Sequence, residues 1–150
     1  MADFSLRLII LVVVCVLVAI AVVAGRMLVA RRRQQALAAE PLVFASSDND
    51  KDDHEHLVRI LAFSSEDCRQ CHTLQQPALE RLLKQSGDKI EVVHVDAVTR
   101  HDLTERYKVL TVPTTVVLDT EGNAHAVNYG FANTQKLQEQ VNAILGLAIS

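Results

Sequence analysis

The feature that most constrains this chain is an uncharged apolar run near its amino terminus, from Leu8 to Gly25. As an α-helix its 18 residues would extend roughly 27 Å, because each residue adds about 1.5 Å, and this is close to the ~30 Å hydrocarbon core of a bilayer. Arg26 can snorkel to the interface, which lets the helix continue through Met27 to Ala30. We therefore expect a transmembrane helix within an amino-terminal segment, residues 1–33.

A cleaved signal peptide is the alternative explanation of the same run. Small residues around Ala19-Ile20-Ala21 would permit cleavage. However, the run is long for a signal peptide, and the stretch before it carries one arginine, Arg7, beside one acid, Asp3. A signal peptide has its positive charge ahead of the apolar run, whereas here the arginine cluster follows it. An uncleaved, single-pass anchor is the better explanation.

The arginines around the run also predict its orientation. Arg26, Arg31, Arg32 and Arg33 follow the helix within one short stretch, and only Arg7 precedes it. The positive-inside rule therefore places the carboxy-terminal domain in the cytoplasm. The free terminal amine adds a positive charge on the other side, so an extracytoplasmic domain stays open as the alternative.

The charge balance argues against a nucleic-acid partner. From Asp48 onward the chain has ten Lys and Arg against sixteen Asp and Glu, so the domain behind the anchor is acidic. The whole chain has no Trp, two Tyr and four Phe, which leaves little aromatic surface for stacking on bases. Nucleic-acid-binding domains instead present a basic surface. We expect the membrane, and not nucleic acid, as the partner of the amino-terminal segment.

The rest of the chain divides into a linker, residues 34–56, and a domain, residues 57–150. Within the linker, Pro41 to Ala45 could form a short first strand, and the charged stretch from Ser46 to His56 predicts a solvated loop. His54 and His56 belong to that loop, where no further ligand pattern supports a metal site.

The domain reads as an alternation of strands and helices. Apolar runs predict strands at 57–63, 90–95, 114–118 and 124–129, and amphipathic patterns predict helices at 72–85 and 102–107 and a last one capped by Asn133. Pro77 should kink the first of these helices. The order β-α-β-α-β-β-α predicts an α/β fold with a central mixed β-sheet flanked by helices.

Cys68 and Cys71 form a C-x-x-C between the first strand and the first helix of the domain. A helix amino terminus offers unpaired N–H groups and the positive end of the macrodipole, both of which favour a thiolate. In such positions the thiol pKa of C-x-x-C pairs falls from about 8.5 to ~3.5–7.5. We expect Cys68 to be the exposed nucleophile and Cys71, one turn on, to attack the mixed disulfide.

These motifs together resemble the thioredoxin superfamily. The strand ending before Cys68, the proline-containing helix after Cys71 and the Val112-Pro113-Thr114 sequence before a strand and hairpin follow the order of that family, over roughly Pro41 to Ser150. The resemblance implies a thioredoxin-like fold and thiol-disulfide exchange with protein substrates, without a cofactor. It also implies a cis peptide at Pro113 and an extended substrate segment that pairs with the Val112 backbone.

The departures from thioredoxin suggest a specialised relative. Arg69-Gln70 stands between the cysteines instead of Gly-Pro, and the helix proline lies one residue further from the second cysteine than in thioredoxins. By the resemblance, the buried Asp of thioredoxins falls at Ala62 and its Lys partner near Val92. A dedicated partner, or a role like that of the membrane-anchored thiol oxidoreductases of cytochrome maturation, fits this site as well as general disulfide reduction.

Three other functions use the same residues. Cys68-x-x-Cys71-His72 is also the signature of c-type haem attachment, which predicts a small helical domain with a distal Met or His. A zinc site would need a second pair of ligands, which the scattered histidines do not supply. A non-catalytic thioredoxin-like module would bind a partner through the face around Pro113.

Overall fold

The computed structural model of the chain describes residues 2–42 and 57–148. Most of the suggested short strand, the acidic loop, His54 and His56 lie outside the described residues. The contacts between residues divide the chain into two compact units, Met1–Gln34 and Gln35–Ser150.

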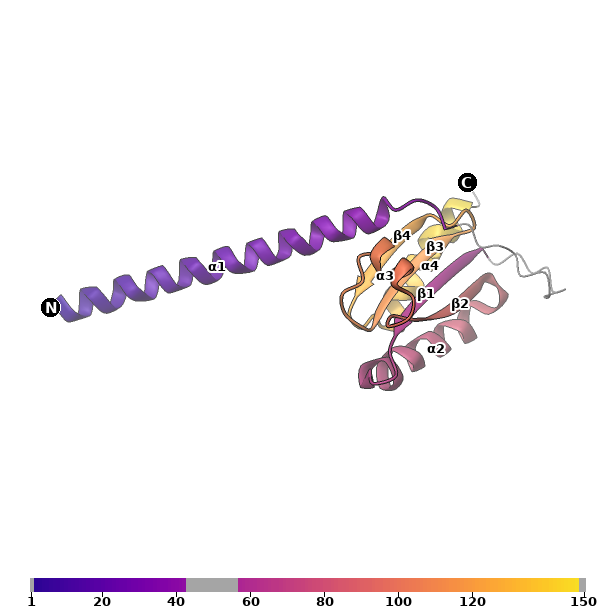
Figure 1. The fold of residues 1–150 in the computed structure, drawn as a ribbon, viewed down its shortest axis with the longest axis horizontal. Helices are drawn as coiled ribbons and strands as arrows, with labels where there is room; N and C mark the ends of the chain where they lie inside the picture. Colours follow the sequence, from indigo (N-terminus) through magenta and orange to yellow (C-terminus); the bar gives the residue numbers. More distant parts are fainter. Residues whose placement is uncertain (1, 43–56, 149–150) are drawn as a thin grey trace. The chain divides into compact units, whose positions relative to one another are not determined.

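The first unit consists of most of one long helix, α1, which spans Ala2–Leu37 and whose last three residues belong to the second unit (Figure 1). Its stretch from Ile9 to Leu37 contains an 18-residue window with a mean hydropathy of 3.0, none of which is buried by other parts of the chain. The helix is therefore long and apolar enough to cross a membrane, although a signal sequence near the amino terminus would satisfy the same criteria.

The second unit begins with the last turn of α1. Ala36 is fully buried in the core of this unit, and the main chain then continues without regular structure to Leu42. The N–H of Leu42 donates to the carbonyl of Gly122 at 3.1 Å, and a guanidinium N–H of Arg106 donates to the carbonyl of Glu40 at 3.3 Å. This part of the predicted linker is thus packed against the domain.

A four-stranded mixed sheet forms the centre of the second unit, with the order β2-β1-β3-β4. β1 pairs in parallel with β2 and antiparallel with β3, and β3 pairs antiparallel with β4. This is the mixed α/β architecture that the sequence predicts. The strands are β1 (Val58–Ser64), β2 (Ile90–Asp96), β3 (Thr114–Asp119) and β4 (Ala124–Tyr129).

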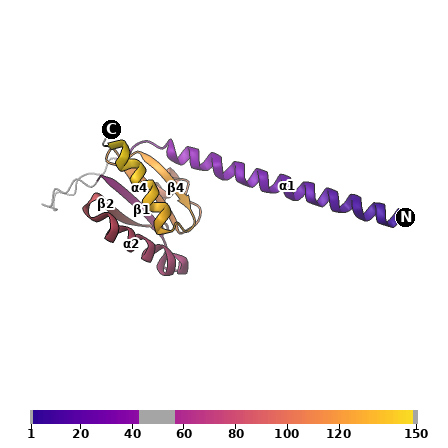
Figure 2. The same cartoon turned by 180° about the vertical axis from the view of Figure 1, so that it is seen from behind.

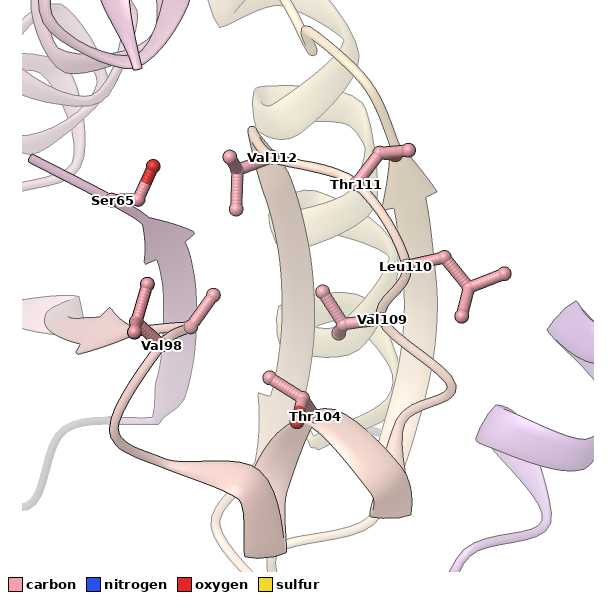
Figure 3. A pocket seen from close by; sticks show the side chains of 8 residues that line it. Ser65, Val98, Thr104, Val109, Leu110, Thr111 and Val112 are labelled. Atoms are coloured by element: carbon pink, nitrogen blue, oxygen red, sulfur yellow. The ribbon is translucent and has the colours of Figure 1, made fainter. Parts of the chain in front are cut away.

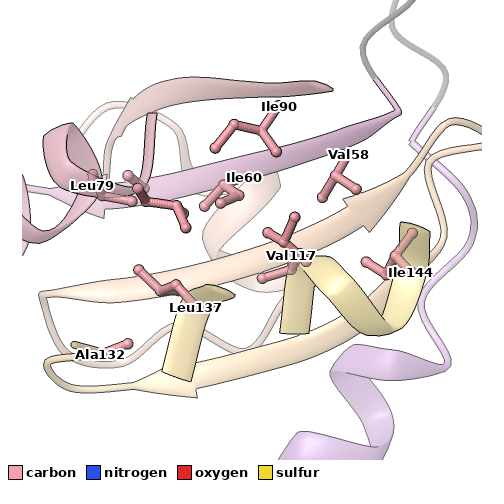
Figure 4. Packing of buried hydrophobic residues seen from close by; sticks show 11 residues of the cluster. Val58, Ile60, Leu79, Ile90, Val117, Ala132, Leu137 and Ile144 are labelled. Atoms are coloured by element: carbon pink, nitrogen blue, oxygen red, sulfur yellow. The ribbon is translucent and has the colours of Figure 1, made fainter. Parts of the chain in front are cut away.

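Helices cover both faces of the sheet, as Figures 1 and 2 show from opposite sides. On one face, α2 and α4 pack over an apolar cluster that includes Ile60, Val117 and Leu137 (Figure 4). The other face carries a second cluster, which includes Leu103 of α3 and Tyr107 directly after it. The helical segments are η1 (Cys71–Gln75), α2 (Gln76–Ser86), η2 (Gly87–Lys89), α3 (His101–Arg106) and α4 (Thr134–Ala148).

The segment after Cys71 differs from the single kinked α-helix that the sequence predicts. It starts as the π-helical turn η1, and the N–H of Gln76 donates to the carbonyl of Cys71, five residues back. Pro77 then stands in the first turn of α2, which directly continues η1. The π-helical turn accommodates one residue more than an α-helical turn, and it lies directly before the turn that contains the proline.

Candidate active site

Cys68 and Cys71 are joined as a disulfide, with their Cα atoms 5.3 Å apart. Cys68 follows a turn closed by a hydrogen bond from its own N–H to the carbonyl of Ser65 at 3.1 Å, directly after β1. Cys71 begins η1. The buried strand and the helix thus hold the two sulfur atoms at their junction, where the sequence places them.

Cys68 directly precedes helical residues 69–70, which lead into η1. Its carbonyl accepts hydrogen bonds from the N–H groups of Cys71 and His72, at 3.1 and 3.3 Å. Its Sγ lies 3.2 Å from the N–H of Cys71, which donates to it. A sulfur atom in this position faces the unpaired N–H groups of the helix start, so the reduced protein can stabilise negative charge on Cys68.

The two cysteines differ in accessibility. Cys68 is partly exposed, whereas Cys71 is 5% exposed. The charged residues beside them are Glu66, Asp67 and Arg69, all of which are exposed to solvent. An incoming disulfide therefore has access to Cys68 first, and Cys71 lies behind it.

The loop before β3 carries the cis peptide bond that the resemblance implies, between Val112 and Pro113. Pro113 is buried, and its carbonyl accepts a hydrogen bond from the N–H of Gly130 at 2.9 Å. Among the described residues, the N–H and carbonyl of Val112 have no hydrogen-bond partner. The Val112 backbone is thus available for pairing with another chain.

A shallow pocket of about 230 Å³ lies beside this loop. Ser65 and Val112 face each other across it, so the turn before Cys68 and the loop before β3 meet at one opening (Figure 3). The exposed Val98 and Leu110 provide apolar side chains at the same pocket. The structure therefore brings the predicted substrate-binding loop close to the turn that leads into Cys68.

Sequence reasoning did not identify Gln75 as part of this region. The side chain of Gln75 is 3% exposed and forms two hydrogen bonds with the backbone of Ala132, which follows β4. Nothing in the sequence distinguishes Gln75 from the exposed Gln76 beside it, because the partner is 57 residues away.

A second, smaller cavity of about 90 Å³ lies behind Cys71, between η1 and the strands β1 and β2. Ala62 of β1 lines it and is 4% exposed, and His94 of β2 stands opposite Ala62 in the strand register. Val92 is partly buried in the apolar cluster on the same face. No carboxylate lines this cavity, in agreement with the apolar residues that the sequence places there.

Within residues 2–42 and 57–148, the structure contains no group of three or more His, Cys, Asp or Glu arranged to hold a metal ion.

A sequence model of the thioredoxin family matches residues 43–143, about two thirds of the chain. The chain belongs to the thioredoxin family.

A thioredoxin from Bacillus subtilis supports this assignment. It is 33% identical over 75 residues, which cover 50% of this chain and 70% of the relative. The family relationship accounts for the order of the C-x-x-C, the following helix and the Val112-Pro113 loop.

Solved thioredoxin structures share the fold. The germline-specific thioredoxin Deadhead of Drosophila melanogaster superimposes with a TM-score of 0.52 at 27% identity, covering 60% of this chain and 83% of the other. A mutant thioredoxin from Halobacterium salinarum gives a TM-score of 0.54 at 24% identity, covering 70% of this chain and 90% of the other. The thioredoxin-like fold predicted from the sequence is therefore confirmed.

The thioredoxin domain also decides between the chemistries that the C-x-x-C suggests. A c-type haem protein would form a small helical domain, whereas this domain is built on a mixed sheet. His94, one of the histidines of the domain, belongs to strand β2 and not to a helix. A thioredoxin domain with two cysteines at disulfide distance supports thiol-disulfide oxidoreductase activity.

Proposed function

We propose that this protein is a membrane-anchored thiol-disulfide oxidoreductase that exchanges electrons with protein disulfides through Cys68 and Cys71. The observation that carries the proposal is the placement of Cys68 just before the helical segment that contains Cys71, with the Sγ of Cys68 accepting the N–H of Cys71 at 3.2 Å. That N–H stabilises the thiolate form of Cys68, which is the form that attacks a disulfide.

In the reducing direction, the Cys68 thiolate attacks one sulfur of a substrate disulfide and releases the other as a thiolate. Cys71 then attacks the Sγ of Cys68 in the mixed disulfide, which frees the second substrate thiol and leaves the Cys68–Cys71 disulfide. The substrate gains two electrons and the cysteine pair loses two. The oxidising direction runs through the same intermediate in reverse.

We assign substrate binding to Val112 and Pro113. An extended substrate segment would pair with the unpartnered N–H and carbonyl of Val112, while Pro113 contributes no competing N–H. The pocket that Val112 shares with Ser65 would take an apolar side chain of the same segment.

We further propose that α1 anchors the domain and that the domain faces the cytoplasm. Four arginines follow the apolar run within a few residues, and one precedes it. In the cytoplasm the glutathione and thioredoxin systems keep thiols reduced, so the protein would act there as a reductase.

Reduction of insulin by the full-length protein in detergent micelles tests the activity. We expect Cys68→Ser to abolish it, and Cys15→Ser, which changes the free cysteine of α1, to preserve it. Equal activity in Cys68→Ser and the unchanged protein would contradict thiol exchange at this site and would favour the binding-module alternative.

Labelling with a membrane-impermeant thiol reagent tests the orientation. In intact cells carrying the Cys15→Ala variant, Cys68 should react only after the membrane is permeabilised. Labelling in unbroken cells would place the domain outside the cytoplasm.

A further inference from the structure

The cavity behind Cys71 is lined by side chains that could accept the proton of this buried thiol. This cavity is lined by Ala62, Phe63, Ser64, Cys71, His72, Gln75, Gln76, Leu79 and His94. In the proposed reaction, Cys71 must lose a proton before its sulfur can attack the mixed disulfide, because the thiolate is the nucleophile. Cys71 is 5% exposed, so bulk water has little access to that proton.

Two of the side chains that line the cavity are histidines, the residue type that most often serves as a general base. Gln75 has no free acceptor for the task, because its oxygen already accepts the N–H of Ala132. The amide of Gln76 donates to Glu80 on the exposed side of α2. An amide or hydroxyl group is also far too weak a base for a thiol at this pH.

His72 is turned towards another partner. Its Nε2 lies 3.2 Å from the backbone carbonyl of Glu66. A carbonyl oxygen only accepts hydrogen bonds, so this contact requires the proton on Nε2 and holds the ring against the turn before Cys68. The imidazole of His94, by contrast, has no hydrogen-bond partner among the described residues.

His94 points into the cavity because of the strand register. It stands opposite Ala62 in the parallel β1–β2 pair, so both side chains lie on the face that η1 covers. The side chain of His94 is exposed at the edge strand, where it can exchange protons with solvent. The cavity volume of about 90 Å³ is ample for a bridging water, which requires roughly 10–15 Å³.

We propose that His94 is the proton-transfer residue of the second step and acts on Cys71 through water in this cavity. This inference rests on the proposed function. When the mixed disulfide resolves, the Cys71 thiol gives its proton through the water to His94, and its sulfur bonds to the Sγ of Cys68. The bond between Cys68 and the substrate sulfur breaks, and the substrate leaves as a thiolate that takes a proton from solvent.

The neighbours of His94 on this face are few. Cys71 and His72 come from η1, β1 contributes the uncharged Ala62, and Asp96 lies two residues further along the same face of β2. The carboxylate of Asp96 accepts hydrogen bonds from the N–H of Val98 and the hydroxyl of Thr99, so it is occupied in the loop after the strand.

The two steps can be timed separately with dithiobis-nitrobenzoate, an aromatic disulfide that releases a coloured thiolate at each step. The reduced full-length protein in detergent micelles releases one equivalent when Cys68 attacks and a second when Cys71 resolves the mixed disulfide. All variants carry Cys15→Ala, because the free thiol of Cys15 would also react. The first release reports that the fold and Cys68 are intact.

We expect His94→Gln to slow the second release roughly 10- to 100-fold at pH 7, as loss of a general base does, and to leave the first release unchanged. The difference should shrink as the pH rises, because the thiol then ionises without the help of a base. His72→Gln and His101→Gln, which change the other cavity histidine and an exposed histidine of α3, should resolve at the unchanged rate.

Equal second-release rates in His94→Gln and the unchanged protein at pH 7 would overturn the inference. If His94→Gln slowed the second release by the same factor at every pH, the inference would also be wrong. A factor that does not depend on pH indicates a structural disturbance, because the need for a base disappears once the thiol is ionised. If His72→Gln slowed the second release and His94→Gln did not, His72 and not His94 would be the proton-transfer residue, and the inference would be wrong. If the unchanged protein itself released only one equivalent, the proposed function would fail, and this result is distinct from all of the others.

Discussion

Gln75 and Ala132 exchange two hydrogen bonds although 57 residues separate them in the chain. The Nε2 of Gln75 donates to the carbonyl of Ala132 at 3.1 Å, and its Oε1 accepts the N–H of Ala132 at 2.9 Å. Both residues are buried. The pair ties the helical turn that carries Cys71 to the segment between β4 and α4.

Replacing this side chain should destabilise the domain. Gln75→Ala would leave a buried N–H and a buried carbonyl without partners, so we expect the free energy of unfolding to fall by about 2–3 kcal/mol. Urea unfolding of the full chain can be followed by tyrosine fluorescence, because both tyrosines, Tyr107 and Tyr129, lie in the second unit. The matched control is Gln76→Ala, which removes an exposed side chain bonded only to Glu80 and should change the stability by less than about 0.5 kcal/mol. Equal losses in the two variants would contradict the structural role of Gln75.

The elements of the domain could be predicted from sequence because their signals are local. The strand expected at 57–63 appears as Val58–Ser64, and the hairpin strand expected at 124–129 has the same bounds in the structure. The cap by Asn133 is also confirmed, since its Oδ1 accepts the N–H of Lys136 at 2.9 Å. Strand periodicity, turn residues and caps each depend on neighbours within a few positions.

The features missed by sequence reasoning depend on contacts between distant segments. The Gln75–Ala132 pair joins η1 to the loop after β4, and the cavity behind Cys71 arises where η1 meets two strands. The π-helical turn is an intermediate case. The sequence shows a proline one residue late, but only the packed structure shows that a wider turn accommodates the additional residue.

Gly122 should tolerate no side chain, because the backbone of Leu42 is too close. A Cβ added at Gly122 would lie 2.4 Å from the carbonyl oxygen of Leu42, and the φ angle of Gly122 is +84°. We expect Gly122→Ala to reduce the free energy of unfolding by about 2–4 kcal/mol, from the strained φ and the clash together. Limited proteolysis should then cleave more readily around Leu42.

Gly130→Ala is the control, because Gly130 has a similar φ of +89° but nothing within 4 Å of the added Cβ. Similar losses in both variants would show that the Leu42 contact contributes little.

Lowering the pH should destabilise the β3–β4 hairpin, because the carboxylate of Asp119 becomes protonated. Burial alone would raise the pKa of this carboxyl, but the hydrogen bonds from His125 and Asn123 outweigh it and the pKa is lowered. Because the folded pKa lies below the unfolded value of about 3.9, the stabilisation is complete above that value and is lost as the pH falls through the folded pKa. Urea unfolding at a series of pH values below about 5 measures this effect. The free energy of unfolding should fall less steeply with decreasing pH in Asp119→Asn than in the unchanged protein.

Asp102 provides the comparison for this titration. The hydrogen bond from Arg100 is the main cause that lowers the pKa of Asp102 to about 2, but both groups are fully exposed and solvent screens the pair. Asp102→Asn should therefore alter the acid curve less than Asp119→Asn does. A larger effect at Asp102 would show that the hairpin contact is not the principal acid-sensitive interaction of the two.

A charge at Val98 should weaken protein substrates selectively. Val98 is 63% exposed and lines the pocket that Val112 shares with Ser65, so a bound apolar side chain would cover it. Val98→Lys should raise KM for insulin roughly tenfold, because about 1.5 kcal/mol of apolar burial is lost. The first release from dithiobis-nitrobenzoate should keep its rate, since that small disulfide reaches Cys68 without occupying the pocket. Leu83→Lys introduces the same charge at an exposed apolar position of α2 outside this pocket and should leave both reactions unchanged. If Val98→Lys slowed both substrates equally, the residue would act on the cysteines or the fold, and the pocket would not be the substrate-binding surface.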